Sequence, residues 1–509
     1  MLGQLVLTMD NFISIIRKYQ TKNIIEVFAK LSNEIFKNQH KKETLNYFPW
    51  LPIKYCRSPH TTETGTVALP AWNIQNIQYL SIKHGNDWRQ ETIKTNQELA
   101  AIVSCYRRHE NRHSGSEKIT SASTAYKYMF GMCYEQFLYG NLSWVFQRFN
   151  RNYHILFGSN SINRPIEIDA VIQERIGLST KELVIIYLII LWLCDTTPDI
   201  LTAPETLYRK KTETILTKEN IKKVIDYYTV SYRDVKESSI AHQIFYNKPF
   251  VKTQKGITLM TNWYLIWMLI ADGLYWIVRD HYKETDDQDF IEKFGIMFES
   301  YFQELLSTYF REGQYQKLSP AKQKKGKQLK GADFVLFFDN AVVLIEIKSA
   351  LINLQAKQQN PNIELIDTYL DRNIKKACIQ LQESEKKFAG MKPVVKFILL
   401  YENILSTAIM QSTMSDIAVN NKSTYIITIE DMENFLVLHK NDKEKAEAVL
   451  SRLLTEKTND FSGLQAELHK AEASTSHHSL TEINHFDFFE RILNDELCKT
   501  TLSATSIQK

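Results

Sequence analysis

The sequence predicts a multi-domain α+β protein with a mainly α-helical N-terminal region, a central core of mixed strands and helices, and a helical C-terminal extension. Three observations lead to this prediction. Apolar residues recur at helical spacing through most of residues 1–285, whereas short runs of Val, Ile, Leu and Phe, typical of buried strands, gather within residues 286–440. Residues 441–509 are charged and again helical in pattern, and a length of 509 residues suits about three domains.

Within the N-terminal region, which forms one or two subdomains, the spacing of apolar residues predicts mostly helices. They are expected over 10–36, 97–113, 123–150, 183–194, 218–228 and 262–282, with short strands at 67–69 and 77–82. The run at 183–194 is the most apolar, but it ends well short of the ~20 residues that a membrane span needs. We therefore expect a buried core helix there and no association with a membrane.

Residues 123–150 are dense in aromatic side chains, and their helical spacing predicts a buried core. At the end of this segment Arg148, Arg151 and Tyr153 interleave cations with a ring, a pattern also found on surfaces that stack against single-stranded nucleic acid. Both interpretations remain open at this point, and the buried core is the more common of the two.

Composition restricts the class of protein. A net charge of +4 is too small to indicate nucleic-acid binding by itself, so any electrostatic footprint has to be local. The six cysteines are scattered and none has metal-ligand or redox spacing, which predicts reduced, buried thiols in a cytoplasmic protein. The first residues lack the basic start and apolar stretch of a signal peptide, so none is expected.

The segment from Gly331 to Ser349 predicts a central β-hairpin. Two apolar runs flank Asp339-Asn340, a dipeptide that suits a tight two-residue turn. If Phe338 pairs with Ala341, Asp333 lies opposite Glu346. Since side chains alternate along a strand, Lys348 shares the face of Glu346. Two carboxylates and one ammonium would thus meet at one end of a hairpin that is covered on both sides.

The elements around this hairpin have a defined order. A strongly amphipathic helix is expected at 290–306, followed by a first strand near 313–318 and then the hairpin. After it come a helix at 367–388, strands at 393–401 and 424–429, and a closing helix from 430. Further charged helices are expected from 443 to 468.

Asp333 followed by Glu346-Ile347-Lys348 resembles the active-site hairpin of the PD-(D/E)xK nuclease superfamily, which includes many restriction endonucleases. The order of elements over residues 286–440 is similar to the restriction endonuclease-like αβββαβ core of that family, with Ala332 where the motif has Pro. The resemblance also matches Glu299, in the first helix, and Gln380, in the helix after the hairpin, to positions near the family's active site.

The resemblance implies a metal-dependent nuclease, most often a DNA endonuclease, in some members for defence against foreign DNA. Asp333, Glu346 and the carbonyl of Ile347 would hold Mg²⁺ or Mn²⁺, a hard cation that prefers oxygen ligands. Lys348 would orient or deprotonate the attacking water. A loop rich in lysine and free of acids precedes Asp333, and it could hold a phosphodiester backbone or remain a solvated loop; the lysines concerned are Lys322, Lys324, Lys325, Lys327 and Lys330.

Two other functions remain open. The same hairpin could carry a buried ion pair in a catalytically inactive nucleic-acid-binding or assembly protein, with the N-terminal region holding a partner protein or a second copy of the chain. Alternatively, His109-Glu110-x-x-His113 has the spacing of a zinc metallopeptidase, in which two imidazoles share one helical face. Arg108 and Arg112 oppose a dication there, which favours an ordinary basic helix end.

Overall fold

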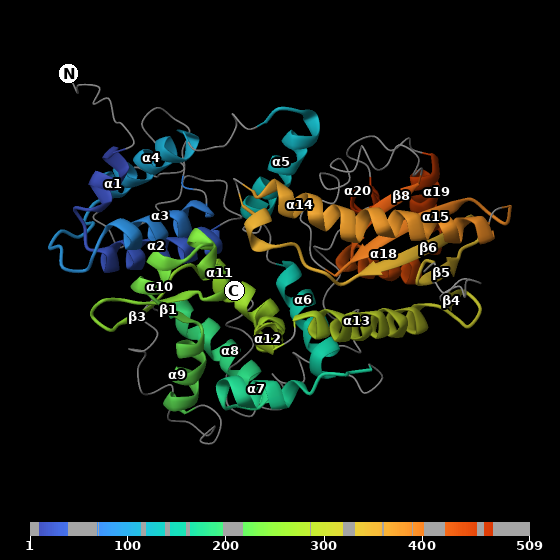
Figure 1. Cartoon of the computed structure of the whole chain (residues 1–509), viewed down its shortest axis with the longest axis horizontal. Coiled ribbons are helices and arrows are strands. Elements are labelled where there is room, and N and C mark those ends of the chain that lie inside the picture. The colour runs from blue at the N-terminus through green and yellow to red at the C-terminus, as the bar shows by residue number, and fades with distance from the viewer. Residues whose placement is uncertain are drawn as a thin grey trace. The chain divides into compact units, whose positions relative to one another are not determined.

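The computed structural model describes residues 10–38, 69, 71–112, 119–137, 143–158, 163–196, 217–285, 287–318, 331–358, 361–388, 390–401, 423–455 and 463–471. The protein is α+β, as the sequence predicts, with helices near both ends of the described chain and two mixed sheets. It forms two compact units (Figure 1). The first comprises the described parts of 1–114 and 168–281, and the second those of 115–167 and 282–488.

The first unit is mainly helical. Its three-stranded sheet pairs β1 (Thr229–Ser231) with β2 (Phe250–Lys252) in parallel and β2 with β3 (Thr258–Met260) in antiparallel fashion. Its helices are α1 (Asp10–Ile16), α2 (Thr21–Asn38), α3 (Asn73–His84), α4 (Asn96–Arg112), α7 (Ile168–Ile176), α8 (Thr180–Thr196), α9 (Lys218–Tyr227), α10 (Tyr232–Glu237), α11 (Ile244–Asn247) and most of α12 (Trp263–Thr285).

The apolar run at 183–194 lies in α8, and its residues from 183 to 187 are buried, as predicted. Among the described residues, no helix combines the length and the hydropathy that crossing a membrane requires. The strand expected at 77–82 is wrong, because these residues belong to α3. Of the other expected strand, residues 67 and 68 lie outside the described residues.

The second unit is built on a five-stranded sheet in the order β4-β5-β6-β7-β8. The strands are β4 (Tyr315–Lys317), β5 (Phe334–Phe337), β6 (Val342–Lys348), β7 (Val394–Leu400) and β8 (Thr424–Thr428). The first three are antiparallel, and β6, β7 and β8 run parallel. The helices are α5 (Ala122–Phe137), α6 (Ser143–Tyr153), α13 (Asp287–Tyr309), α14 (Ile363–Tyr369), α15 (Lys376–Phe388), α18 (Ile429–Asn441), α19 (Lys443–Thr455) and α20 (Leu464–Lys470).

The hairpin of β5 and β6 has the predicted register. Phe334 pairs with Ile345 and Phe337 with Val342, and the Phe338 N–H donates to the Ala341 carbonyl at 2.9 Å. The first strand expected near 313–318 is found as β4, which pairs with β5.

Helices α15 and α13 lie on opposite sides of the hairpin (Figure 1). Alternation along its strands sorts the side chains onto these two faces. On one face, Val335 and Leu344 pack in a buried cluster with Ala377 and Leu381 of α15. On the other face the ring of Phe334 contacts Phe302 of α13, and Phe338 contacts Phe435 of α18. The hairpin is therefore central, and residues at even positions of β6 face α15.

The boundary expected after residue 285 lies close to the division between the units, which falls between His281 and Tyr282 within α12, but the N-terminal side of the division needs a correction. Residues 115–167, assigned from the sequence to the N-terminal region, belong to the compact second unit. The helices α19 and α20, expected in a separate extension, also belong to that unit. Local sequence patterns carry no information on these pairings, because they depend on contacts between residues far apart in the chain.

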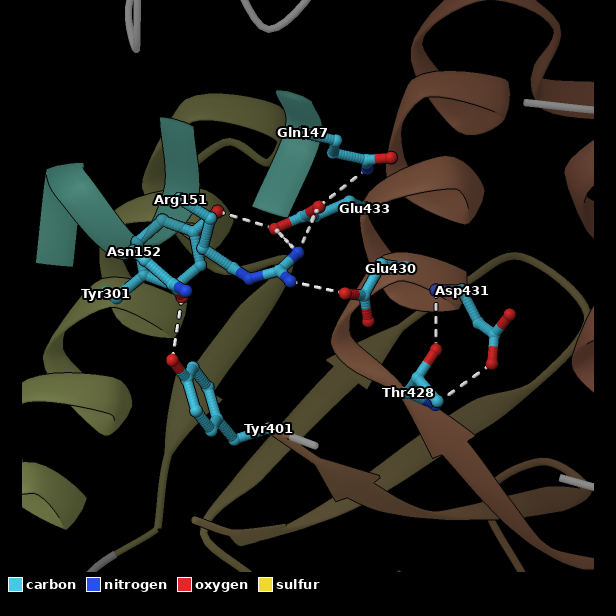
Figure 2. A network of polar contacts seen from close by, with 9 residues as sticks. All are labelled: Gln147, Arg151, Asn152, Tyr301, Tyr401, Thr428, Glu430, Asp431 and Glu433. Atoms are coloured by element: carbon cyan, nitrogen blue, oxygen red, sulfur yellow. Dashed lines mark hydrogen bonds and ion pairs between the residues drawn. The ribbon is translucent and has the colours of Figure 1, made fainter. Parts of the chain in front are cut away.

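Arg151 of α6 ties this inserted segment to the rest of the second unit (Figure 2). Its guanidinium donates to the carboxylates of Glu430 and Glu433, both in α18. Tyr301 of α13 donates to Glu433 at 2.6 Å, so three helices meet here. The side chains of Arg151 and Glu433 are each 2% exposed. The interpretation of Arg151 and Tyr153 as a surface that stacks on nucleic acid is therefore wrong, since Tyr153 is also buried.

Candidate active site

Asp333 is held at the start of β5 by backbone contacts on both sides. Its N–H donates to the Ile345 carbonyl at 2.9 Å, and its carbonyl accepts from the Leu318 N–H at 2.8 Å. Its carboxylate accepts a hydrogen bond from the Ile347 N–H at 2.8 Å. The side chain thus crosses to β6, next to Glu346, as the register predicts.

Glu346 and Lys348 lie two positions apart on β6 and both face α15. The Lys348 ammonium donates to Glu346 Oε1 at 2.6 Å and to Gln380 Oε1 at 3.3 Å. Glu346 is 2% exposed, and Gln380 is buried as well. The structure therefore brings Asp333, Glu346, Lys348 and Gln380 together at the end of the hairpin.

The surroundings of Glu346 disfavour the charged form of its carboxyl group. Burial, and next the nearby Asp333 carboxylate, raise the pKa of Glu346 to about 8, although Lys348 opposes the shift. Its Oε2 atom is buried and receives no hydrogen bond from an N–H or hydroxyl donor of the described residues, and a side-chain hydrogen bond with Asp333 raises the pKa further. A buried carboxyl in such close contact with a second one is an arrangement that a bound cation would relieve.

Helix α15 supports the site from one side. The Ser384 hydroxyl accepts from the Ala332 N–H at 2.7 Å, and the Gln380 amide reaches the Gly331 carbonyl at 3.5 Å. Gly331 is needed here, because a Cβ at this position would lie 2.6 Å from Ser384 Oγ. Sequence reasoning missed Ser384. The only signal was its position one helical turn after Gln380, which places both side chains on the same face.

Tyr401, directly after β7, holds the end of β6 that carries Lys348. The Tyr401 N–H donates to the Lys348 carbonyl at 3.0 Å, and its hydroxyl donates to Asn152 Oδ1 at 2.7 Å (Figure 2). The N–H and C=O of one residue in an extended strand point to the same side. Since the Ile347 N–H points to Asp333, we expect the carbonyl of Ile347 to point to that side as well.

Not every predicted site residue joins this group. Glu299 lies on α13, which covers the opposite face of the sheet, and it pairs with Lys317 of β4 at 2.6 Å. No described contact connects Glu299 with Asp333 or Glu346. The five lysines expected to hold a phosphodiester backbone lie outside the described residues, and they are Lys322, Lys324, Lys325, Lys327 and Lys330.

The donor set fits a hard divalent cation. Asp333 and Glu346 supply two carboxylates, and a magnesium site commonly uses one or two carboxylates together with waters. Within the described ranges, no group of three or more His, Cys, Asp or Glu side chains is placed to hold a metal ion. With the Ile347 carbonyl, the chain would provide three oxygen ligands.

The zincin-like segment is not organised as a metal site in the described part of the chain. The ring of His109 contacts those of Phe12 and Tyr106, with centroids 5.6 and 6.3 Å away. Glu110 accepts a hydrogen bond from Asn73 at 3.3 Å. Both side chains thus have structural contacts in the first unit, and His113 lies outside the described residues.

No model of a known protein family matches this chain, and a comparison with curated proteins found no match.

Proposed function

We propose that the protein is a metal-dependent nuclease that hydrolyses phosphodiester bonds, with DNA as its substrate and a restriction endonuclease-like core in its second unit. One observation carries the proposal. Asp333, Glu346, Lys348 and Gln380, from two strands and a helix, converge through contacts of 2.6 to 3.3 Å at the end of a central hairpin. The order α13, β4, β5, β6, α15, β7 also supports an αβββαβ core.

Each residue has a distinct role in this proposal. Asp333, Glu346 and the Ile347 carbonyl would hold Mg²⁺ or Mn²⁺, which, when bound, would stabilise the negative charge that builds on the phosphate. Lys348 would orient the attacking water, and its ammonium donates to Glu346 at 2.6 Å. Gln380 would fix the ammonium of Lys348, and Ser384 would fix the backbone that carries Asp333.

A nuclease assay on DNA and RNA, single- and double-stranded, with and without Mg²⁺ or Mn²⁺, tests the proposal. We expect metal-dependent cleavage that Asp333→Ala and Lys348→Ala each reduce by at least about 100-fold, in line with the loss of one group that acts on the developing charge. Asp339→Asn is the matched control, because Asp339 lies in the turn at the other end of the hairpin and pairs with Lys443 at 2.7 Å. Cleavage that persists in Lys348→Ala would contradict the proposal.

A second candidate is a catalytically inactive protein that uses the hairpin as a scaffold. The observation that favours it is the direct contact of Lys348 with Glu346, since a buried ion pair can serve structure alone. This candidate predicts that the wild-type protein binds nucleic acid or a partner protein but leaves every substrate uncut in the presence of either metal.

A further inference from the structure

An exposed tryptophan lies in the loop after α3, in the first unit. The side chain of Trp88 is 69% exposed. A single exposed apolar side chain needs no functional explanation by itself. The surroundings of Trp88, however, combine a rigid loop with several cations.

The loop is tied down by the two residues just before Trp88. The buried carboxylate of Asp87 accepts hydrogen bonds from the N–H groups of Lys22 and Gln254, at 2.7 and 2.9 Å, and from the Tyr232 hydroxyl at 2.9 Å. The Thr21 N–H donates to the Asn86 carbonyl at 3.0 Å. An indole on such a loop loses little conformational freedom on binding, which favours its use as a contact residue.

Cations from separate elements gather around His84, the last residue of α3, which immediately precedes this loop. The Arg17 guanidinium, after α1, donates to the His84 carbonyl at 3.3 Å. Burial first, and then the charges of Arg17, Lys83 and Lys236, lower the pKa of His84. Lys83 lies in the last turn of α3 and Lys236 lies in α10, so three segments bring positive charge close to His84. In the described part of the chain, no carboxylate forms an ion pair with Lys83 or Lys236.

Another cation adjoins the indole directly. The Lys255 ammonium lies 5.9 Å from the centroid of the Trp88 ring. Lys255 sits in the tight turn between β2 and β3, where the Thr253 N–H donates to the Ile257 carbonyl at 2.8 Å. Gly256 has a φ of 80°, which favours glycine and keeps this turn tight. The lysine is thus presented on a short, ordered connection.

We propose that this surface, formed by Arg17, Lys83, Trp88, Lys236 and Lys255, binds single-stranded nucleic acid. The indole would stack on an unpaired base, and the cations would contact the phosphates on either side. A base within a duplex has both faces covered by its neighbours, so the exposed indole favours a single strand. The choice of nucleic acid over an acidic polypeptide rests on the proposed function.

The test is a binding experiment on the full chain without divalent metal, so that cleavage does not interfere. The affinity for a fluorescein-labelled oligothymidylate is measured by fluorescence anisotropy at several salt concentrations. We expect Trp88→Ala to weaken binding by about tenfold, the loss of one base stack, and Trp88→Phe to retain most of the affinity. The double variant Lys83→Gln/Lys236→Gln should reduce the slope of log K against log salt by about 1.4.

Lys222→Gln is the matched control, because Lys222 is a 58% exposed lysine of the same unit that lies in α9 and pairs with Asp226. It should leave both affinity and salt slope unchanged.

The inference is overturned if the oligothymidylate does not bind, if Trp88→Ala binds as tightly as wild type, or if polyglutamate competes as strongly as a second oligonucleotide. Trp88-dependent binding by a chain that cuts no substrate would support this inference and reject the proposed nuclease. Cleavage without Trp88-dependent binding would do the reverse.

Discussion

Arg151 of α6 donates two hydrogen bonds to the carboxylate of Glu433 in α18, at 3.2 and 3.0 Å, although 282 residues separate them in the chain. A third hydrogen bond reaches Glu430 in the same helix (Figure 2). Burial raises the pKa of Glu433, and the Arg151 charge opposes this shift. The buried cation is therefore needed to hold two carboxylates in the interior of the second unit.

Replacing this cation should destabilise the second unit strongly. We expect Arg151→Met to lower the free energy of unfolding by about 3–5 kcal/mol, because it leaves Glu430 and Glu433 buried without a counter-charge. The shift of the urea midpoint measures the effect. The control is Arg233→Met, at an exposed i,i+4 pair with Glu237, where we expect a change below about 0.5 kcal/mol. Stability unchanged in Arg151→Met would show that the pair contributes nothing.

The raised pKa of Glu346 makes stability depend on pH in the metal-free protein. The folded-state pKa is about 8 and the ordinary value is 4.5, so the neutral form is favoured on folding. This contribution is fully present below about pH 4.5 and is lost as the pH rises towards 8, with a slope of at most about 1.4 kcal/mol per pH unit.

Urea unfolding of wild type and Glu346→Gln across this pH range measures the slope. The substitution should flatten the dependence, because the amide stays neutral at every pH. Glu219→Gln, at an 81% exposed carboxylate of α9, should leave the wild-type slope in place. If the free energy of unfolding of the wild-type protein rises steadily from pH 5 to 8, the prediction is wrong.

Metal binding can be tested without any activity. If Asp333 and Glu346 hold the cation, Mg²⁺ or Mn²⁺ at about 100 times its Kd should stabilise the folded protein by about 2.7 kcal/mol and raise Tm. Asp333→Asn and Glu346→Gln should lose this shift, whereas Asp339→Asn should keep it, since its side chain pairs with Lys443 at the far turn. Equal shifts in wild type and Asp333→Asn would place the cation elsewhere.

Ser384 acts on the site through the backbone, as a positioning residue. Ser384→Ala removes the acceptor of the buried Ala332 N–H and should cost about 1–3 kcal/mol of stability. If the protein is a nuclease, kcat should fall while KM changes little, because the shift affects Asp333 and not the substrate-binding surface. The control is Ser307→Ala, whose exposed hydroxyl donates to the Glu304 carbonyl in α13. A normal kcat in Ser384→Ala would remove Ser384 from the site.

Much of the candidate site could be predicted because its geometry is local. The two-residue turn at Asp339 and the alternation of side chains determine that Asp333 lies opposite Glu346, and the structure has this register. Gln380 was matched only through resemblance, and in the structure its side-chain oxygen accepts a hydrogen bond from Lys348.

Other features depended on long-range contacts. Residues 77–82 suggested a strand because buried polar side chains obscure the helical stripe of α3. Gln78 can be buried there because its amide donates hydrogen bonds to the carbonyls of Ile25 and Thr261. Thr261 is 183 residues away in the chain. Similarly, Glu299 of α13 pairs with Lys317 of β4, and this pairing between separate elements could not be read from the sequence spacing.

By itself the sequence determined the α+β class, the hairpin with its register and the three residues at its end, because periodicity and turn chemistry act between near neighbours. Long-range contacts, which are seen only in the folded protein, place residues 115–167 in the second unit, bury Arg151 against two carboxylates and bring the Ser384 hydroxyl to the Ala332 N–H beside Asp333. The physical reason is that burial and ion pairing depend on which distant segments meet, and side-chain patterns along one segment do not encode the partner.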